Sequence, residues 1–127
     1  SRLVTNSVSC TSAFSQKAAA AAIQGPQDSV KMMLKEFKER SKIVVDGFND
    51  IKGISCIQPK GAFYAFPNIK DTGYKSQELS DALLNQGVAV LPGTSFGKYG
   101  EGYLRISFAN SRENLVKALN IIKSFLD

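Results

Sequence analysis

The chain has 127 residues, of which 43% are hydrophobic and 21% are charged, and its formal net charge at pH 7 is +5. This length and composition predict one globular domain that buries a core of its own. Histidine is absent and cysteine occurs only twice, which excludes zinc fingers, Cys/His nucleophile pairs and histidine acid–base catalysis.

The distribution of apolar and charged residues bears on possible partners. No apolar run approaches the roughly 18 residues that span a bilayer, and residues 1–10 lack a signal-peptide layout. We therefore expect no membrane partner, and the two cysteines, far apart in the chain, favour a reduced, cytoplasmic setting. The basic charge raises nucleic acid as a partner, but Glu36 and Glu39 alternate with the lysines of one predicted helix. That alternation is typical of a solvated helix face, and we expect no nucleic-acid partner.

Two helices are predicted in the first half of the chain. Residues 11–24 begin with hydroxyl side chains and continue into an alanine run, which predicts a helix that ends at Gly25. Pro26 suits the first turn of a second helix. Apolar residues then recur at three- and four-residue spacing until Gly53, so this second helix is long and amphipathic.

The middle of the chain changes to strand-like periodicity. Residues 54–58 and 62–66 are predicted strands on either side of a turn at 59–61, an arrangement that resembles a hairpin. Ser76 is expected to cap a helix that ends at Gly87. The residues of this helix that we expect to face inward are Leu79, Leu83 and Leu84.

The last third predicts two strands and a helix. Residues 88–91 form a buried strand, and residues 92–102 hold four glycines and a proline, too many helix and strand breakers for regular structure. Residues 103–108 form another strand, and Ser111 caps a final amphipathic helix. The predicted fold is therefore an α/β (α+β) two-layer arrangement with a small mixed or antiparallel sheet covered by helices.

Arg105 is the candidate site residue in the strand 103–108. Alternation places Leu104 on one face of this strand, and Arg105 on the other face between Tyr103 and Ser107. A planar guanidinium in that position can bind a carboxylate or phosphate through two parallel hydrogen bonds. An ordinary solvent-facing arginine is the alternative, and periodicity alone favours it.

Other candidate features carry weaker functional signals. Residues 92–97 could hold an anion with backbone N–H groups, but they match neither common phosphate-binding glycine pattern. The aromatic residues of 59–64 are most simply explained by core packing. Cys10 and Cys56 lack basic neighbours that would lower a thiol pKa, so we expect unreactive thiols.

Four segments, taken together and in order, resemble the aspartate aminotransferase family of pyridoxal-phosphate enzymes (fold type I, class I/II). Residues 12–27 resemble the helix that follows the cofactor lysine, and PKGAFY at 59–64 is similar to the family's P-x-G-A-F-Y segment. GVAVLPGTSFG at 87–97 and YLRISFA at 103–109 complete the order. The resemblance implies an aminotransferase C-terminal small domain over 1–127, with residues 1–25 as the tail of the upstream cofactor-binding region.

The resemblance also implies roles for particular residues. In the family the arginine of the RISFA segment binds the α-carboxylate of the substrate, and that residue here is Arg105. Phe63 should line the substrate pocket and residues 92–97 should shape its wall, whereas alternation turns Tyr64 to the opposite face. The lysine that holds pyridoxal 5'-phosphate as a Schiff base, the aspartate partner of its pyridine nitrogen and most of its phosphate ligands lie upstream in the family. We therefore assign no catalytic, cofactor-binding or metal residue to this chain, and expect it to bind the cofactor weakly and to be inactive by itself.

For the intact protein, the resemblance implies a homodimeric transaminase of biosynthetic metabolism. It would move an amino group between an amino acid, aspartate-like or of broad type, and a 2-oxo acid. One alternative is another fold type I enzyme, such as a carbon–sulfur lyase or an aminocyclopropane carboxylate synthase, because the carboxylate-binding arginine does not distinguish these reactions. A second, from a different class, is a non-catalytic basic binding module, which would lose affinity steeply with added salt.

Overall fold

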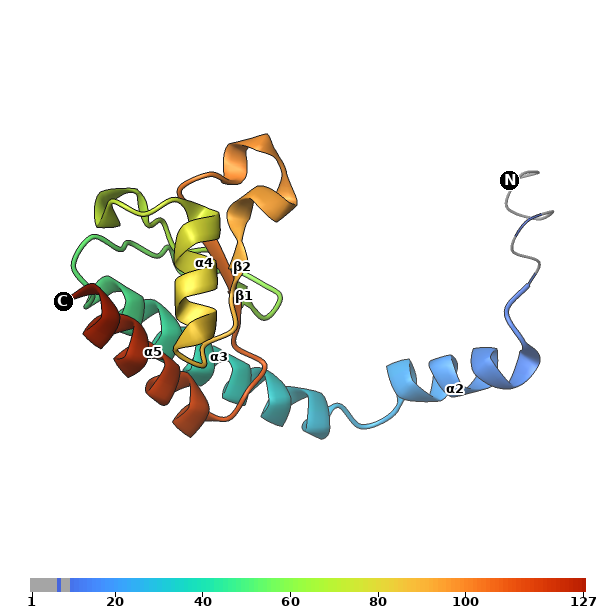
Figure 1. Ribbon diagram of the computed structural model, residues 1–127. Helices are drawn as coiled ribbons and strands as arrows, with labels where there is room; N and C mark the ends of the chain where they lie inside the picture. The colour runs from blue at the N-terminus through green and yellow to red at the C-terminus, as the bar shows by residue number, and fades with distance from the viewer. Residues whose placement is uncertain (1–6, 8–9) are drawn as a thin grey trace. The chain divides into compact units, whose positions relative to one another are not determined.

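The computed structural model describes residue 7 and residues 10–127 (Figure 1). By packing, the chain divides into two compact units, Ser1–Met33 and Leu34–Asp127. Helix α2 (Ala13–Gln24) belongs to the first unit, and the sheet with helices α4 and α5 belongs to the second. Helix α3 (Asp28–Asn49) begins in the first unit and continues in the second.

Helix α2 agrees with the helix expected from the alanine run. It ends where predicted, and the backbone N–H of Gly25 donates to the carbonyl oxygen of Ala21 at 2.8 Å. Ser12 lies at the N-cap, but its hydroxyl donates to the hydroxyl of Ser15 and caps no backbone N–H. No residue of α2 is buried, so within this unit the helix depends on the high intrinsic propensity of alanine.

Helix α3 is the long amphipathic helix, with bounds that differ from the prediction. It starts at Asp28, so Pro26 precedes the helix, and it ends at Asn49, four residues before Gly53. Among the described residues, neither this helix nor any other is both long and apolar enough to cross a membrane. The buried residues of α3 are Ser41, Val44, Val45 and Phe48.

The predicted strand at 54–58, and its hairpin with 62–66, are wrong. Ser55 and Asn68 exchange two backbone hydrogen bonds, of 3.0 and 2.8 Å, as an isolated antiparallel bridge. At the next residue, the side-chain amide of Asn49 both accepts from the backbone N–H of Cys56, at 2.7 Å, and donates to its carbonyl, at 3.0 Å. A side chain thus takes the backbone groups that a neighbouring strand would have used.

Three short strands form the sheet. They are β1 (Tyr64–Ala65), β2 (Leu91–Pro92) and β3 (Leu104–Ser107), and each is shorter than predicted. The buried strand predicted over 88–91 is wrong, because β2 begins only at Leu91, which is exposed. The order is β1-β3-β2 and both pairings are antiparallel, with Tyr64 opposite Ser107 and Leu91 opposite Arg105. With helices packed against one face, this is the expected α/β two-layer fold, in its antiparallel form.

The last two helices confirm one predicted cap and contradict another. Helix α5 (Arg112–Leu126) begins after Ser111, whose hydroxyl accepts from the backbone N–H of Asn114 at 3.2 Å, as expected. Helix α4 (Ser76–Asn85) has Lys75 at its N-cap, so Ser76 does not cap it. Leu79 and Leu83 are buried as predicted, but Leu84 is 59% exposed and that prediction is wrong.

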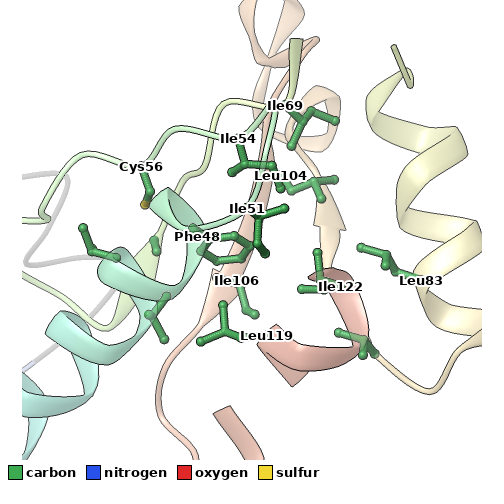
Figure 2. Packing of buried hydrophobic residues seen from close by; sticks show 14 of the residues in the cluster. Phe48, Ile51, Ile54, Cys56, Ile69, Leu83, Leu104, Ile106, Leu119 and Ile122 are labelled. Carbon is green, nitrogen blue, oxygen red and sulfur yellow. The ribbon is translucent and has the colours of Figure 1, made fainter. Parts of the chain in front are cut away.

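The core lies between the sheet and helices α3, α4 and α5. Figure 2 shows Phe48 of α3 beside Ile106 of β3, with Leu119 and Ile122 of α5 close by. Leu83 brings α4 into the same cluster. Burial of these large side chains, each stabilising the fold by roughly 1.5–3 kcal/mol, holds the layers together and leaves the other face of the sheet available for a site.

Candidate functional site

The candidate site is the outer face of the sheet. We define this face as the side chains that point away from the core, on the three strands and at the two residues next to them, Phe66 and Tyr103. Alternation along β3 is as predicted, because Leu104 and Ile106 are buried whereas Arg105 and Ser107 are not. The face is rich in aromatic residues and carries one cation. Its members are Tyr64, Phe66, Leu91, Tyr103, Arg105 and Ser107.

Arg105 lies between two aromatic rings on this face. Its guanidinium carbon is 4.4 Å from the ring centre of Tyr64 and 3.9 Å from that of Phe96. Since β3 is the central strand, Tyr64 of β1 approaches from one side and Phe96, which follows β2, from the other. Among the described residues, no carboxylate forms an ion pair with Arg105. Its N–H donors are therefore available to an anionic ligand.

A small hollow opens beside this guanidinium. Its volume is about 220 Å³, and its lining includes Tyr64, Leu91, Arg105 and Ser107. Because sites for whole small molecules usually measure about 300–1,000 Å³, this hollow suits one end of a ligand. A second hollow of about 380 Å³ shares Tyr64 and includes Tyr103. A larger hollow, of about 690 Å³, follows the exposed side of α5 and contains no residue of the outer face.

Phe63 does not line either of these outer-face hollows, although it neighbours Tyr64, which lines both, and its place in the substrate pocket stays a prediction. Its ring centre is 6.2 Å from that of Phe37 and 4.5 Å from that of Tyr64. The expectation that Phe63 and Tyr64 point in opposite directions is therefore wrong. Alternation does not extend to Phe63 because it precedes β1 and follows Ala62, whose φ of 57° interrupts the extended backbone.

Two aromatic residues at the site were missed by sequence reasoning. Tyr64 had a usable signal, since alternation within the strand places it on the face opposite the buried Ala65. Phe96 had none, because it belongs to a 3-10 turn, Gly93–Phe96, inside the glycine-rich segment. Phe96 lines neither outer-face hollow, so the expectation that this segment shapes the wall of the substrate pocket stays a prediction; what the segment does provide is a ring in contact with Arg105.

Hydrogen bonds join the end of the glycine-rich segment to the start of α4. The carboxylate of Glu101 accepts from the backbone N–H groups of Ser76, at 2.9 Å, and Gly102, at 3.0 Å. These backbone hydrogen bonds, that from Ser76 first, hold the pKa of Glu101 below its ordinary value. The buried hydroxyl of Ser76 accepts from the N–H of Gly102 at 2.9 Å. Ser76 thus anchors the segment.

Comparison with known proteins identifies the family. The model of the family "Aminotransferase class I and II" matches residues 2–122. The chain belongs to this aminotransferase family. It is 50% identical over 100 residues to an aspartate aminotransferase of Pyrococcus horikoshii, a match that covers 78% of this chain and 26% of that protein.

Further members of the aminotransferase family agree in sequence and in structure. An aromatic-amino-acid aminotransferase of Thermococcus litoralis is 40% identical over 120 residues, which cover 92% of this chain and 31% of that protein. The crystal structure of an aromatic aminotransferase from Pyrococcus horikoshii superposes with a TM-score of 0.89 at 40% identity, over 98% of this chain and 34% of that one. The chain thus spans about a quarter to a third of the length of these relatives.

Proposed function

We propose that residues 1–127 are the substrate-binding C-terminal part of a pyridoxal-phosphate-dependent aminotransferase, and that Arg105 binds the α-carboxylate of the amino-acid substrate. Residues 1–25 would be the tail of the upstream cofactor-binding region. The observation that carries the proposal is the Arg105 guanidinium on the outer face, without a carboxylate partner among the described residues and beside a hollow for one end of a ligand.

The physical role of Arg105 follows from the geometry of its fork. A transaminase must hold the bond to the α-hydrogen perpendicular to the plane of the cofactor, and two parallel hydrogen bonds to a carboxylate fix that orientation. Two aromatic rings contact the guanidinium of the half-buried Arg105, and partial removal from water strengthens charge-assisted hydrogen bonds. Arg105 supplies position and charge, and we assign it no part in proton transfer.

Pyridoxal phosphate, when bound, supplies the electron sink for the substrate's α-carbon. The residues of the outer face do not fit the anchoring of this cofactor. Among the described residues, no lysine lines either hollow of the outer face. The ammonium of Lys70 lies over the ring of Tyr103, 5.0 Å from its centre, and we assign Arg105 to the substrate. We place the cofactor lysine in the part of the relatives' length that this chain does not span. We accordingly expect the 127-residue chain to bind pyridoxal phosphate weakly and to catalyse no transamination.

The names of the relatives bear on the reaction and the substrate. They are aspartate and aromatic aminotransferases, which supports transamination over a carbon–sulfur lyase or a basic binding module. We propose an amino acid of aspartate-like or broad type as the donor and a 2-oxo acid as the acceptor. The family resemblance further supports a cytoplasmic homodimer, which size-exclusion chromatography with light scattering of the full-length protein would test.

The test is an Arg105→Lys variant of the full-length protein. Lysine keeps the charge but loses the fork, so kcat/KM for the amino acid should fall about tenfold to hundredfold, the equivalent of a charge-assisted hydrogen bond of about 1.5–3 kcal/mol. Lys42→Ala, at an exposed position of α3, is the control and should leave kcat/KM unchanged. Near-normal kcat/KM in Arg105→Lys would show that the carboxylate binds elsewhere.

The cofactor is tested separately by absorbance. We expect the full-length protein to show the visible band of bound pyridoxal phosphate, which changes on adding an amino acid and returns on adding a 2-oxo acid. The 127-residue chain should show no such band at equal cofactor concentration. A folded full-length protein without any cofactor band would contradict the proposal and favour a binding module.

A further inference from the structure

The geometry points to Phe96 as a positioning residue for Arg105: its ring holds the plane of the guanidinium so that the N–H fork meets the hollow beside β2. This inference rests on the proposed role of Arg105 in binding a carboxylate. It concerns a residue of the glycine-rich segment that touches Arg105 and lines neither hollow of the outer face.

The contact between Phe96 and Arg105 is close enough to determine orientation. A separation of 3.9 Å between the guanidinium carbon and the ring centre is van der Waals contact. An edge-on guanidinium would bring its N–H atoms into the ring at this separation, so the planar group lies against the ring face. The donors then remain at the edge of the guanidinium, where a carboxylate can accept two parallel hydrogen bonds.

The backbone of the segment fixes the position of the ring independently of Arg105. Residues 93–100, which we call the Phe96 loop, close on themselves at Gly93 and Gly100. A Cβ atom added at Gly93 would lie 2.2 Å from the carbonyl oxygen of Gly100, so the two backbones are in direct contact. The N–H of Gly93 also donates to the carbonyl of Tyr103 at 2.8 Å. Only glycine permits so close an approach.

The same loop is tied to the rest of the fold just after it closes. Glu101 and the hydroxyl of Ser76 both accept from the N–H of Gly102, and Ser76 is completely buried at the start of α4. Phe66 of the outer face meets Phe96 edge to face, with ring centres 6.4 Å apart. The ring of Phe96 is therefore held by the backbone of the loop, by α4 and by Phe66, although it is 47% exposed.

A ring held in this way orders the arginine before a ligand arrives. An arginine on a half-wet sheet face otherwise loses side-chain rotamer freedom when it binds, which costs affinity. Tyr64 supplies a second contact, at 4.4 Å, from a strand fixed by pairing. Of the two aromatic residues that contact Arg105, only Phe96 lies in a loop. A substitution of Phe96 should therefore alter the orientation of Arg105 without altering the sheet.

The first measurement is the NMR signal of the Arg105 Nε–Hε group in the 127-residue chain. The ring current of Phe96 shields protons above its face, so this signal should be displaced from that of a solvent-exposed arginine. Phe96→Leu should move it part of the way back, because the ring of Tyr64, at 4.4 Å, still shields it, whereas Phe96→Tyr should keep it fully displaced. Tyr99→Leu is the matched control, because Tyr99 belongs to the same loop, is 84% exposed and contacts Lys98. An undisplaced signal in the wild type, or no change in Phe96→Leu, overturns the inference.

The second measurement is steady-state kinetics of the full-length protein. Phe96→Leu should raise KM for the amino acid about two- to fivefold, which corresponds to about 0.5–1 kcal/mol for an exposed cation–π contact, and Phe96→Tyr should restore it. If Arg105→Lys raises KM and Phe96→Leu does not, the positioning role is wrong. If Arg105→Lys itself leaves KM unchanged, the proposed function fails, while the NMR signal still decides whether Phe96 orients the guanidinium.

Discussion

Closure of the Phe96 loop depends on the absence of a side chain at Gly100. A Cβ atom there would lie 1.9 Å from the carbonyl oxygen of Gly93 and 2.2 Å from its carbonyl carbon. Both neighbours are backbone atoms, so no side-chain rotation relieves the overlap, and the loop must open by more than about 1 Å to reach the carbon–carbon contact distance. Gly100→Ala should therefore destabilise the chain.

The size of this effect can be bounded from the contacts involved. Overpacking in a well-packed region costs about 1–3 kcal/mol. Opening the loop also strains the 2.8 Å hydrogen bond from Gly93 to Tyr103, whose net contribution is about 1 kcal/mol. We expect Gly100→Ala to lower the free energy of unfolding by about 2–4 kcal/mol, and to shift the Arg105 Nε–Hε signal because the Phe96 ring moves.

The assay is equilibrium urea unfolding of the 127-residue chain, followed by circular dichroism and analysed by linear extrapolation. Gly61→Ala is the matched control, because a Cβ there has no atom within 4 Å and Gly61 is not among the positive-φ glycines. This variant should be neutral or stabilised by up to about 1 kcal/mol, since alanine restricts the unfolded chain. Equal stability of Gly100→Ala and Gly61→Ala would refute the steric account of loop closure.

Three further predictions concern other parts of the chain. Hydrogen bonds from Arg112, and secondarily from Arg40, hold the pKa of Glu36 at about 2 instead of 4.5. The stability that Glu36 contributes is therefore present above pH 4.5 and is lost as the pH falls towards 2. In Glu36→Gln, the free energy of urea unfolding should change less with pH between 4.5 and 2 than in the wild type. The same pH dependence in both proteins would contradict this prediction. Ser111→Ala should cost about 1 kcal/mol in the same unfolding assay, because it removes the N-cap of α5, and a loss below about 0.3 kcal/mol would show that water replaces the cap. Burial raises the pKa of Cys56, whereas Cys10 is exposed. A thiol reagent at pH 8 should therefore modify Cys10 quickly and Cys56 only on unfolding. Equal rates for the two thiols in the native chain would argue against the burial of Cys56.

Local signals in the sequence predicted several elements well. The alanine run predicted α2, and three- and four-residue apolar spacing predicted most of α3 and the inward stripe of α5. Period two along 103–108 predicted which side of β3 faces the core. These succeed because helix propensity and side-chain direction are properties of neighbouring residues in the chain.

The failures occur where distant residues compete for the same backbone groups. The segment 54–58 has strand-like composition, but the side chain of Asn49 occupies the backbone of Cys56. Ser76 has the composition of a helix cap, yet its hydroxyl binds the N–H of Gly102, 26 residues away. No local pattern contains these long-range hydrogen bonds, so sequence reasoning could not choose between the partners.

By itself, the sequence determined the family, the α/β two-layer class and the face of β3 on which Arg105 lies, because each depends on motif order or on periodicity along the chain. Only the tertiary structure decided what surrounds that arginine. Phe96 reaches Arg105 because two glycines close a loop, and because antiparallel pairing places β3 between β1 and β2. Such contacts join residues that are separated in the chain, and their geometry is fixed by packing rather than by local propensity.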